Sequence, residues 1–322
     1  MNVLDYSNKH ALYIKIIILF VSLTYSWLMG YGFYGFGHDF YSVYYRENIY
    51  WYGWSDRLGW IVSTLTLGGY HIGVYLVSLM LALSSGYILR SYFRIKSISS
   101  ILIYFVVYVL VIHTWPIVMS TSNVMRQGVA MSLVFLSLSA LTDHKHKASI
   151  FLAFLSIFAH KSSILFFLLI IHVFFSAWIT KRFASIGRKS ILFSYGLTLA
   201  LSSHFLIDVF KPLEGESRII AGDYRMPFVL INVLFIIFSS TSRGFLHSHT
   251  NLFLYLFSFQ SLSFLVAGYN WEYERLNMMM LIPYVLALSA KFDRKSQIIY
   301  QLTIFSVLFT LTVFTGMYSA LT

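Results

Sequence analysis

Arg126 and Gln127 are the residues whose types and position most clearly suggest chemistry. They stand near the start of an otherwise apolar stretch, Ser120–Leu141, which reads STSNVMRQGVAMSLVFLSLSAL. Arginine is among the least favourable side chains at membrane depth, so its presence there indicates a functional site. The residues of Ser120–Asn123 are helix-capping types, which predicts a helix that begins just before Arg126. A helix N-terminus with an added guanidinium is a binding site for anions, phosphate in particular.

Three further apolar stretches begin beside basic residues in the same way. His160 and Lys161 precede one stretch, Arg225 precedes the second with Pro227 in its first turn, and Arg275 precedes the third. The helix dipole disfavours a cation at such an end unless an anion binds there. Four ends of this kind gathered at one level would form a positively lined pocket suited to phosphate or pyrophosphate.

Each of these residues also has an interpretation without chemistry. Arg126 could extend to the membrane interface, as long cationic side chains do near helix ends, and Lys161 could anchor its helix there. His160 follows an apolar segment, where a histidine is more often a hydrogen-bonded packing residue than a base. Arg218 and Arg225 could pair with the acidic residues of their own loop. The sequence leaves both interpretations open.

Two other polar clusters carry weaker implications. Glu272, Glu274 and Arg275 lie in Gly268–Asn277, which is expected to be an outward-facing loop in which they could satisfy one another. The segment Asp143–Lys147 contains two histidines beside two lysines, a poor metal site without a more distant ligand. We therefore expect a solvated turn there, and no metal or other cofactor.

The elements that must position these residues are membrane helices. The chain has 322 residues, of which 58% are hydrophobic and 11% charged, and its mean hydropathy is +0.72. Soluble domains carry about 25% charged residues. Long apolar runs separated by short polar breaks predict an all-α polytopic bundle whose spans are roughly 20 residues each. No soluble domain fits between them, so residues 1–322 are expected to form a single integral membrane domain.

The charge and cysteine content exclude several classes of protein. The formal net charge is +11, but the basic residues fall at helix ends and form no patch, so we expect no nucleic-acid partner. The chain has no cysteine and therefore no disulfide, thiolate nucleophile or cysteine metal site. The first apolar run, Ala11–Met29, lacks a small-residue cleavage site and is expected to be a retained helix.

The positions of the basic residues predict the orientation of the helices. Every second loop is short and basic, and the positive-inside rule assigns these loops and the N-terminus to the cytoplasm. The basic residues of the N-terminal segment and of these loops, loop by loop, are Lys9 and Lys15; Arg90, Arg94 and Lys96; Lys145 and Lys147; Lys181, Arg182, Arg188 and Lys189; Arg243; and Lys291, Arg294 and Lys295. We expect about eleven helices, of which the fifth, Ala148–Ala159, is short enough either to cross or to re-enter the membrane. The remaining loops face outward, and the aromatic residues of the first, Gly30–Gly59, suit an interfacial belt or a sugar-binding platform.

Four segments, in this order along the chain, resemble a known family. They are GHDFYSVYYREN, MRQGVAMSLVFLSLSAL, FLAFLSIFAHKSSILFFLL and YERLNMMMLIPY. The second and third are similar to the arginine-glutamine and histidine-x-serine pair of EpsG-type polysaccharide polymerases, relatives of the Wzy O-antigen polymerases. The first resembles that family's glycine-x-aspartate segment, and the last its late arginine. Ser163 stands where the family has a small alanine.

The resemblance implies a metal-independent glycosyltransferase of the GT-C type in the bacterial cytoplasmic membrane, with its active site at the outer face. Such an enzyme transfers a glycan from undecaprenyl pyrophosphate to a sugar hydroxyl of another lipid-linked repeat unit, and its chain length can depend on a regulator protein. Negative charge develops on the departing pyrophosphate, and arginines can stabilise it in place of a metal. The expected roles are pyrophosphate binding for Arg126 and Arg275, with Arg218 and Arg225 as further contacts. His160 is the expected base, with Glu272 and Asp39 behind it. Gln127 would orient a sugar or Arg126, and Lys161 is expected to bind substrate.

Two other functions share these features. A flippase or transporter of lipid-linked oligosaccharides also needs a basic cavity, but here the Pro and Gly breaks do not repeat between halves and the polar residues cluster at outer helix ends. An O-antigen ligase shares the pyrophosphate chemistry and differs in its acceptor. Only the resemblance favours polymerase over ligase.

Overall fold

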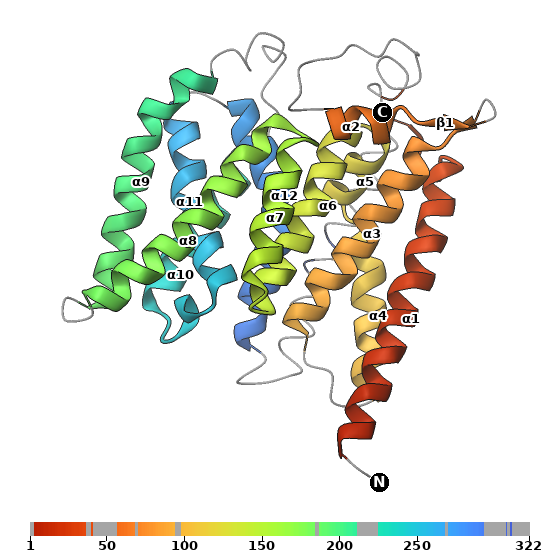
Figure 1. The fold of residues 1–322 in the computed structure, drawn as a ribbon, viewed down its shortest axis with the longest axis horizontal. Coiled ribbons are helices and arrows are strands. Elements are labelled where there is room, and N and C mark those ends of the chain that lie inside the picture. Colours follow the sequence, from red (N-terminus) through yellow and green to blue (C-terminus); the bar gives the residue numbers. More distant parts are fainter. Residues whose placement is uncertain are drawn as a thin grey trace. The chain divides into compact units, whose positions relative to one another are not determined.

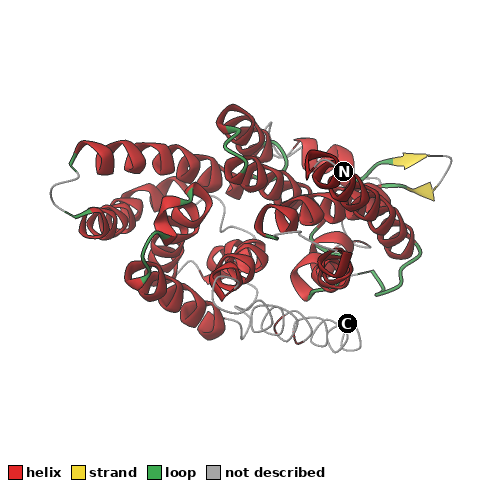
Figure 2. Ribbon diagram, turned by 90° about the horizontal axis from the view of Figure 1, so that it is seen from below, coloured by secondary structure: helices red, strands yellow, loops and turns green. Residues whose placement is uncertain are grey.

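The computed structural model shows helices and, among the residues it describes, one small hairpin (Figures 1 and 2). It describes residues 3–36, 40, 57–67, 70–93, 98–183, 187–210, 225–267, 270–292, 307 and 310. The chain divides into two compact units: unit 1 comprises residues 1–164 and 285–322, and unit 2 comprises residues 165–284. Each unit is described by itself below.

Unit 1 contains the first seven α-helices. They are α1 (Val3–Gly30), α2 (Arg57–Ser63), α3 (Gly73–Tyr92), α4 (Ile98–Ile112), α5 (Trp115–Ser122), α6 (Met125–Thr142) and α7 (His146–Ile157), followed by the short 3-10 helix η2 (Lys161–Ser163). Helix α1 packs on α3, α3 packs on α6, and α6 packs on α7. Between α2 and α3 lies an antiparallel hairpin of β1 (Thr66–Leu67) and β2 (Tyr70–His71), which Figure 2 shows in yellow.

Helix α1 shows why apolar sequence forms these elements. Its inner face, which includes Ile18 and Tyr25, is buried in unit 1, whereas large apolar side chains such as Ile16, Phe20 and Trp27 are more than half exposed. A helix that is apolar on its outer face as well as its inner face suits lipid and not water. The prediction of a membrane helix near the N-terminus agrees with this pattern and with the length and hydropathy of Ala11–Gly30.

The described residues contain four helices that are long and apolar enough to cross a membrane, or five if the bent pair α4 and α5 forms one span. The bend between α4 and α5 is 53°. Pro116 causes it, because proline fits the first turn of α5 but cannot continue the hydrogen-bond ladder of α4. The protein is therefore an all-α membrane protein, as the composition predicted.

A close contact between α5 and α6 sets the position at which α6 begins. A Cβ atom on Gly128 would lie 2.1 Å from the carbonyl oxygen of Ser120, so only glycine allows this approach. The predicted start of the helix just before Arg126 is confirmed, since α6 begins at Met125. The predicted capping is wrong: the N-cap is Val124, with no side-chain bond.

Two of the hydroxyl groups that were expected to cap α6, those of Thr121 and Ser122, bond inside α5 instead. Thr121 Oγ1 and Ser122 Oγ both donate to the carbonyl oxygen of Val118, at 2.8 and 3.0 Å. Ser and Thr hydroxyls commonly bond back to the preceding turn in this way when they lie inside a helix.

Unit 2 holds the remaining described helices. They are α8 (Ile164–Arg182), which begins one residue before the unit boundary, α9 (Arg188–Phe210), α10 (Arg225–Thr241), the 3-10 helix η5 (Phe245–His247), α11 (His249–Val266) and α12 (Asn270–Phe292), whose residues 270–284 belong to this unit. Helix α11 packs on both α9 and α10.

A buried hydrogen-bond network ties α10, α11 and α12 together. Asn232 of α10 donates to Asn277 Oδ1 at 2.7 Å and accepts from the Tyr284 hydroxyl at 2.8 Å. Asn277 also donates to Ser261 Oγ at 3.1 Å, and Tyr284 bonds Ser258 Oγ at 2.7 Å. Because lipid and apolar side chains offer no competing partners, such a network fixes the helices in one register.

The network explains a correction to the sequence prediction. The segment Gly268–Asn277 was expected to be a loop, but α12 begins at Asn270. Tyr273 and Asn277, one helical turn apart, both face Asn232. The helical conformation is required to present them on one face.

We predict that Asn232→Ala lowers the stability of the protein by about 1–3 kcal/mol, because buried partners lose their hydrogen bonds. Thermal unfolding of the purified protein in detergent would measure the change. Val233→Ala is the matched control, since Val233 is 38% exposed on the same helix. Equal melting temperatures for Asn232→Ala and the control would contradict a structural role for the network.

Candidate functional site

Arg126 is the second residue of α6 and lies half-buried in unit 1. The carbon atom at the centre of its guanidinium is 4.3 Å from the centre of the Trp60 ring. Trp60 belongs to α2 and is only 3% exposed. A guanidinium over an aromatic ring is stabilised by a cation–π interaction. Arg126 therefore contacts α2 within unit 1.

Gln127 follows Arg126 and is 2% exposed. Its place in the first turn of α6, beside the close contact of Gly128 with α5, removes it from solvent. An amide side chain carries both donors and an acceptor, so Gln127 adds buried polar groups at the start of α6.

His160 lies in the turn between α7 and α8 and is 8% exposed. Its backbone is extended, and its ring Nδ1 accepts a long hydrogen bond of 3.4 Å from the amide of Ser162, which makes it the N-cap of η2. A neutral ring whose Nδ1 accepts carries its hydrogen on Nε2. Lys161, the first residue of η2, is half-buried.

Helix α2 brings the Arg126 and His160 segments to one place in unit 1. The Leu58 amide donates to the carbonyl oxygen of Phe158 at 2.8 Å. A Cβ atom on Gly59 would meet the carbonyl oxygen of Ala159 at 2.1 Å and Cβ of Arg126 at 3.2 Å. Gly59 therefore lies between the first turn of α6 and the residue before His160. The arginine-glutamine pair and the histidine turn, 33 residues apart in the sequence, share one neighbourhood.

The other predicted site residues fall in unit 2 or outside the described residues. Glu272 is 8% exposed in the first turn of α12, and Arg275 is half-buried within the same helix. The prediction that a cation stands at the start of this helix is therefore wrong, because the acidic residue occupies the first turn, where the helix dipole favours it. Arg225 is the first residue of α10. Asp39 and Arg218 lie outside the described residues, as does the side chain of Arg225.

Sequence reasoning missed Gly59 and Trp60. It placed them at the edge of the first outward loop, with aromatic residues that suit an interfacial belt. The contact of Trp60 with Arg126 joins residues 66 positions apart, and no local pattern in the sequence predicts such a contact. An arginine that must be stabilised inside the membrane could only have suggested that an aromatic partner exists somewhere in the chain.

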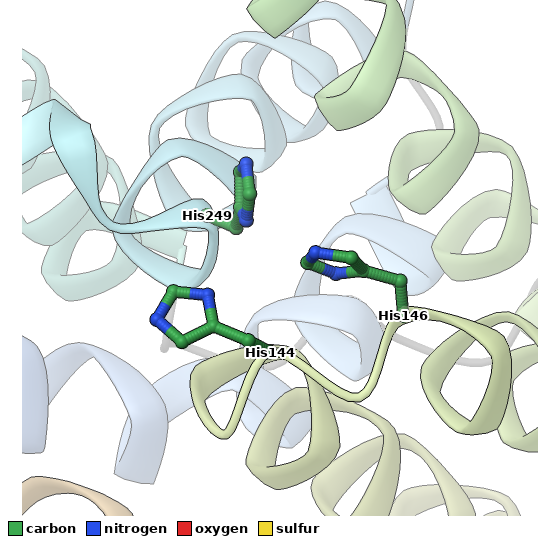
Figure 3. A group of neighbouring side chains, drawn as sticks. All are labelled: His144, His146 and His249. Carbon is green, nitrogen blue, oxygen red and sulfur yellow. The ribbon is translucent and has the colours of Figure 1, made fainter.

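The turn between α6 and α7 carries His144 and His146, whose rings lie edge to face with centres 6.1 Å apart (Figure 3). Asp143 and Lys145 of the same turn form a 3.4 Å ion pair between exposed side chains. This agrees with the solvated turn expected from the sequence. His249, also labelled in Figure 3, begins α11 in unit 2, where its ring packs against Phe174 at 5.7 Å.

Comparison with known proteins gives one match. The sequence model of the EpsG family matches residues 9–321, almost the whole chain. No curated protein and no solved structure matches it.

We predict that Gly59→Ala impairs the site, because the new methyl group would collide with the Ala159 carbonyl and crowd Arg126. Overpacking of this kind costs about 1–3 kcal/mol. Thermal unfolding in detergent and polymer formation in cells would both be measured. Ile61→Ala is the control, because Ile61 is 52% exposed on the same short helix. A Gly59→Ala protein as stable and as active as the control would show that α2 does not pack closely against Ala159 and Arg126.

Proposed function

Because the chain belongs to the EpsG family, we propose that it is a polysaccharide polymerase that joins lipid-linked repeat units at the outer face of the bacterial cytoplasmic membrane. The donor is a glycan on undecaprenyl pyrophosphate, and the acceptor is a sugar hydroxyl of another lipid-linked unit. The family match and the apolar helices support a membrane-bound polymerase. The donor and acceptor chemistry rests on the resemblance and on the polar residues of unit 1.

The proposal extends to the architecture. We propose one membrane domain of about eleven spans with a GT-C-type arrangement and a cytoplasmic N-terminus. The alternation of short basic loops along the sequence supports this topology. In this proposed topology, the start of α6 and the turn between α7 and α8 would lie at the outer face.

One observation carries the assignment of the site: an arginine at the start of a membrane helix is held by cation–π contact beside a turn with a buried histidine. The N-terminus of α6 and the guanidinium of Arg126 both favour an anion. A diphosphate at this position would have its negative charge stabilised as it leaves the anomeric carbon. This is the electrostatic work that the proposed reaction requires.

The proposed reaction forms one bond and breaks one. The acceptor oxygen bonds to the anomeric carbon, the bond from that carbon to the pyrophosphate oxygen breaks, and undecaprenyl pyrophosphate leaves. The proton of the acceptor hydroxyl passes to a base, for which we propose His160. To accept the proton at Nδ1, the ring must release the Ser162 amide, and the 3.4 Å length of that contact makes it weak.

The remaining residues are proposed as substrate contacts. Gln127 and Lys161 lie in the same unit as Arg126 and would orient the sugar or the diphosphate. Arg275, Arg225 and Arg218 are proposed as further diphosphate contacts, and Glu272 and Asp39 as acceptor contacts. A protein that regulates chain length is a further proposed partner.

Transport of a lipid-linked oligosaccharide is the second candidate function. The observation that favours it is the break between α4 and α5, since transporters use discontinuous helices beside their binding sites. An O-antigen ligase would share the diphosphate site and differ in its acceptor. Purified protein with a lipid-pyrophosphate-linked repeat unit from the host separates these candidates, because only a polymerase produces a ladder. We expect the ladder to persist in EDTA.

We predict that Arg126→Ala stops chain growth, with a loss of about 100- to 1,000-fold in rate. Lipid-linked single units should accumulate in cells while the protein stays in the membrane. Arg126→Lys should also fail, because lysine keeps the charge but not the bidentate donors. Arg182→Ala is the control, since Arg182 is an exposed arginine at the end of α8. Normal long chains from Arg126→Ala would refute the assigned role.

We predict that His160→Ala slows transfer by about 100-fold or more while donor binding changes little, as expected for loss of a general base. His172→Ala is the matched control, because His172 is a half-buried membrane-helix histidine that bonds its own helix through Nδ1. His160→Gln distinguishes two roles. Glutamine can donate a hydrogen bond but cannot take a proton at neutral pH. Full activity of His160→Gln would therefore show that His160 acts as a hydrogen-bond donor and not as a base.

A further inference from the structure

Trp60 of α2 contacts the face of the Arg126 guanidinium. The indole is nearly fully buried, and the centre of the guanidinium is 4.3 Å from the centre of its ring. We propose that Trp60 is a positioning residue for Arg126, and that α2 orients this guanidinium toward the diphosphate of the donor. The inference rests on the proposed function and names a part of its site.

The geometry of the contact supports a positioning role. A cation–π interaction uses the charge and the face of a guanidinium, whereas a bidentate diphosphate contact uses the N–H donors at its edge. The two interactions therefore do not compete for the same atoms of Arg126. A guanidinium on a flexible side chain loses conformational freedom when it binds an anion, and a ring that already holds it reduces that loss.

Helix α2 is fixed strongly enough to act as the platform. The amides of Leu58 and Gly59 both donate to the Phe158 carbonyl oxygen, at 2.8 and 3.4 Å. The close approach of Gly59 to the Ala159 carbonyl leaves no room for a side chain. Main-chain contacts thus connect the helix that carries Trp60 to the turn that carries His160, so a shift of α2 would move Arg126 relative to that turn.

A role in packing alone is the alternative, because a buried tryptophan also fills space. The two roles predict different energetic coupling between Trp60 and Arg126 in diphosphate binding. If Trp60 acts through Arg126, its loss changes diphosphate binding only when Arg126 is present, and the effects of the two substitutions are not additive. If Trp60 only fills space, its substitution weakens binding equally with and without Arg126.

The test is a double-mutant cycle on the purified full chain in detergent, with undecaprenyl pyrophosphate as the binding probe. The variants are Trp60→Leu, Arg126→Ala and the two combined, and Trp60→Phe is added because phenylalanine keeps an aromatic face. We expect Trp60→Leu to weaken binding by about 3- to 30-fold, the range that cation–π energies imply. Trp60→Phe should bind more tightly than Trp60→Leu, and the double variant should bind no more weakly than Arg126→Ala.

Trp27→Leu is the matched control, because Trp27 is 57% exposed on the outer face of α1 and should not affect binding. Equal losses from Trp60→Leu in the two backgrounds, or unchanged binding in a folded Trp60→Leu protein, would overturn the inference. If Trp60→Leu does not yield folded protein, the cycle is run with Trp60→Phe and judged by the same coupling. The absence of a polymer ladder from the wild-type protein would instead refute the proposed function, so the two failures are distinguishable.

Discussion

The burial of a positive charge in a membrane protein is the constraint on which unit 1 depends. An arginine at the start of a membrane helix is unfavourable unless its charge is stabilised by the protein or by a ligand. Trp60, on a short helix outside the apolar spans, contributes to that stabilisation. The first turn of α6, the seven residues of α2 and the turn after α7 therefore have to be arranged together, and the candidate site is the place where they meet.

Close backbone contact makes this arrangement possible. Gly59 lets α2 approach the Ala159 carbonyl, and Gly128 lets α6 approach the Ser120 carbonyl. Membrane helices pack tightly through small residues at such crossings, because lipid is as apolar as the side chains and the hydrophobic effect does not drive the helices together. Some hydroxyl groups in these helices bond to the preceding turn, as Ser132 does with the Gly128 carbonyl.

The helices of unit 2 are held together by buried side-chain hydrogen bonds. Hydrogen bonds among Asn232, Asn277 and Tyr284, all nearly fully buried, join α10 to α12, and bonds from Asn277 to Ser261 and between Tyr284 and Ser258 add α11. A network of this kind rewards one register of the helices because every shift would leave a polar group without a partner. It also places the acidic residue Glu272 in the first turn of α12, where the dipole of that helix stabilises it. Of the helix ends on which the sequence prediction relied, the first turn of α12 is therefore acidic, whereas α10 of the same unit begins with Arg225.

The sequence by itself determined the class of protein, because hydropathy acts over each segment separately and long apolar runs can only be membrane helices. It also determined the start of α6 near Arg126 and the break at His160, which local polarity marks. Only the tertiary structure decided that Trp60 holds Arg126, that the capping hydroxyls serve α5, and that Gly268–Asn277 is largely helical. These outcomes depend on contacts between segments far apart in the chain, and the energies of such contacts appear only once the helices have packed.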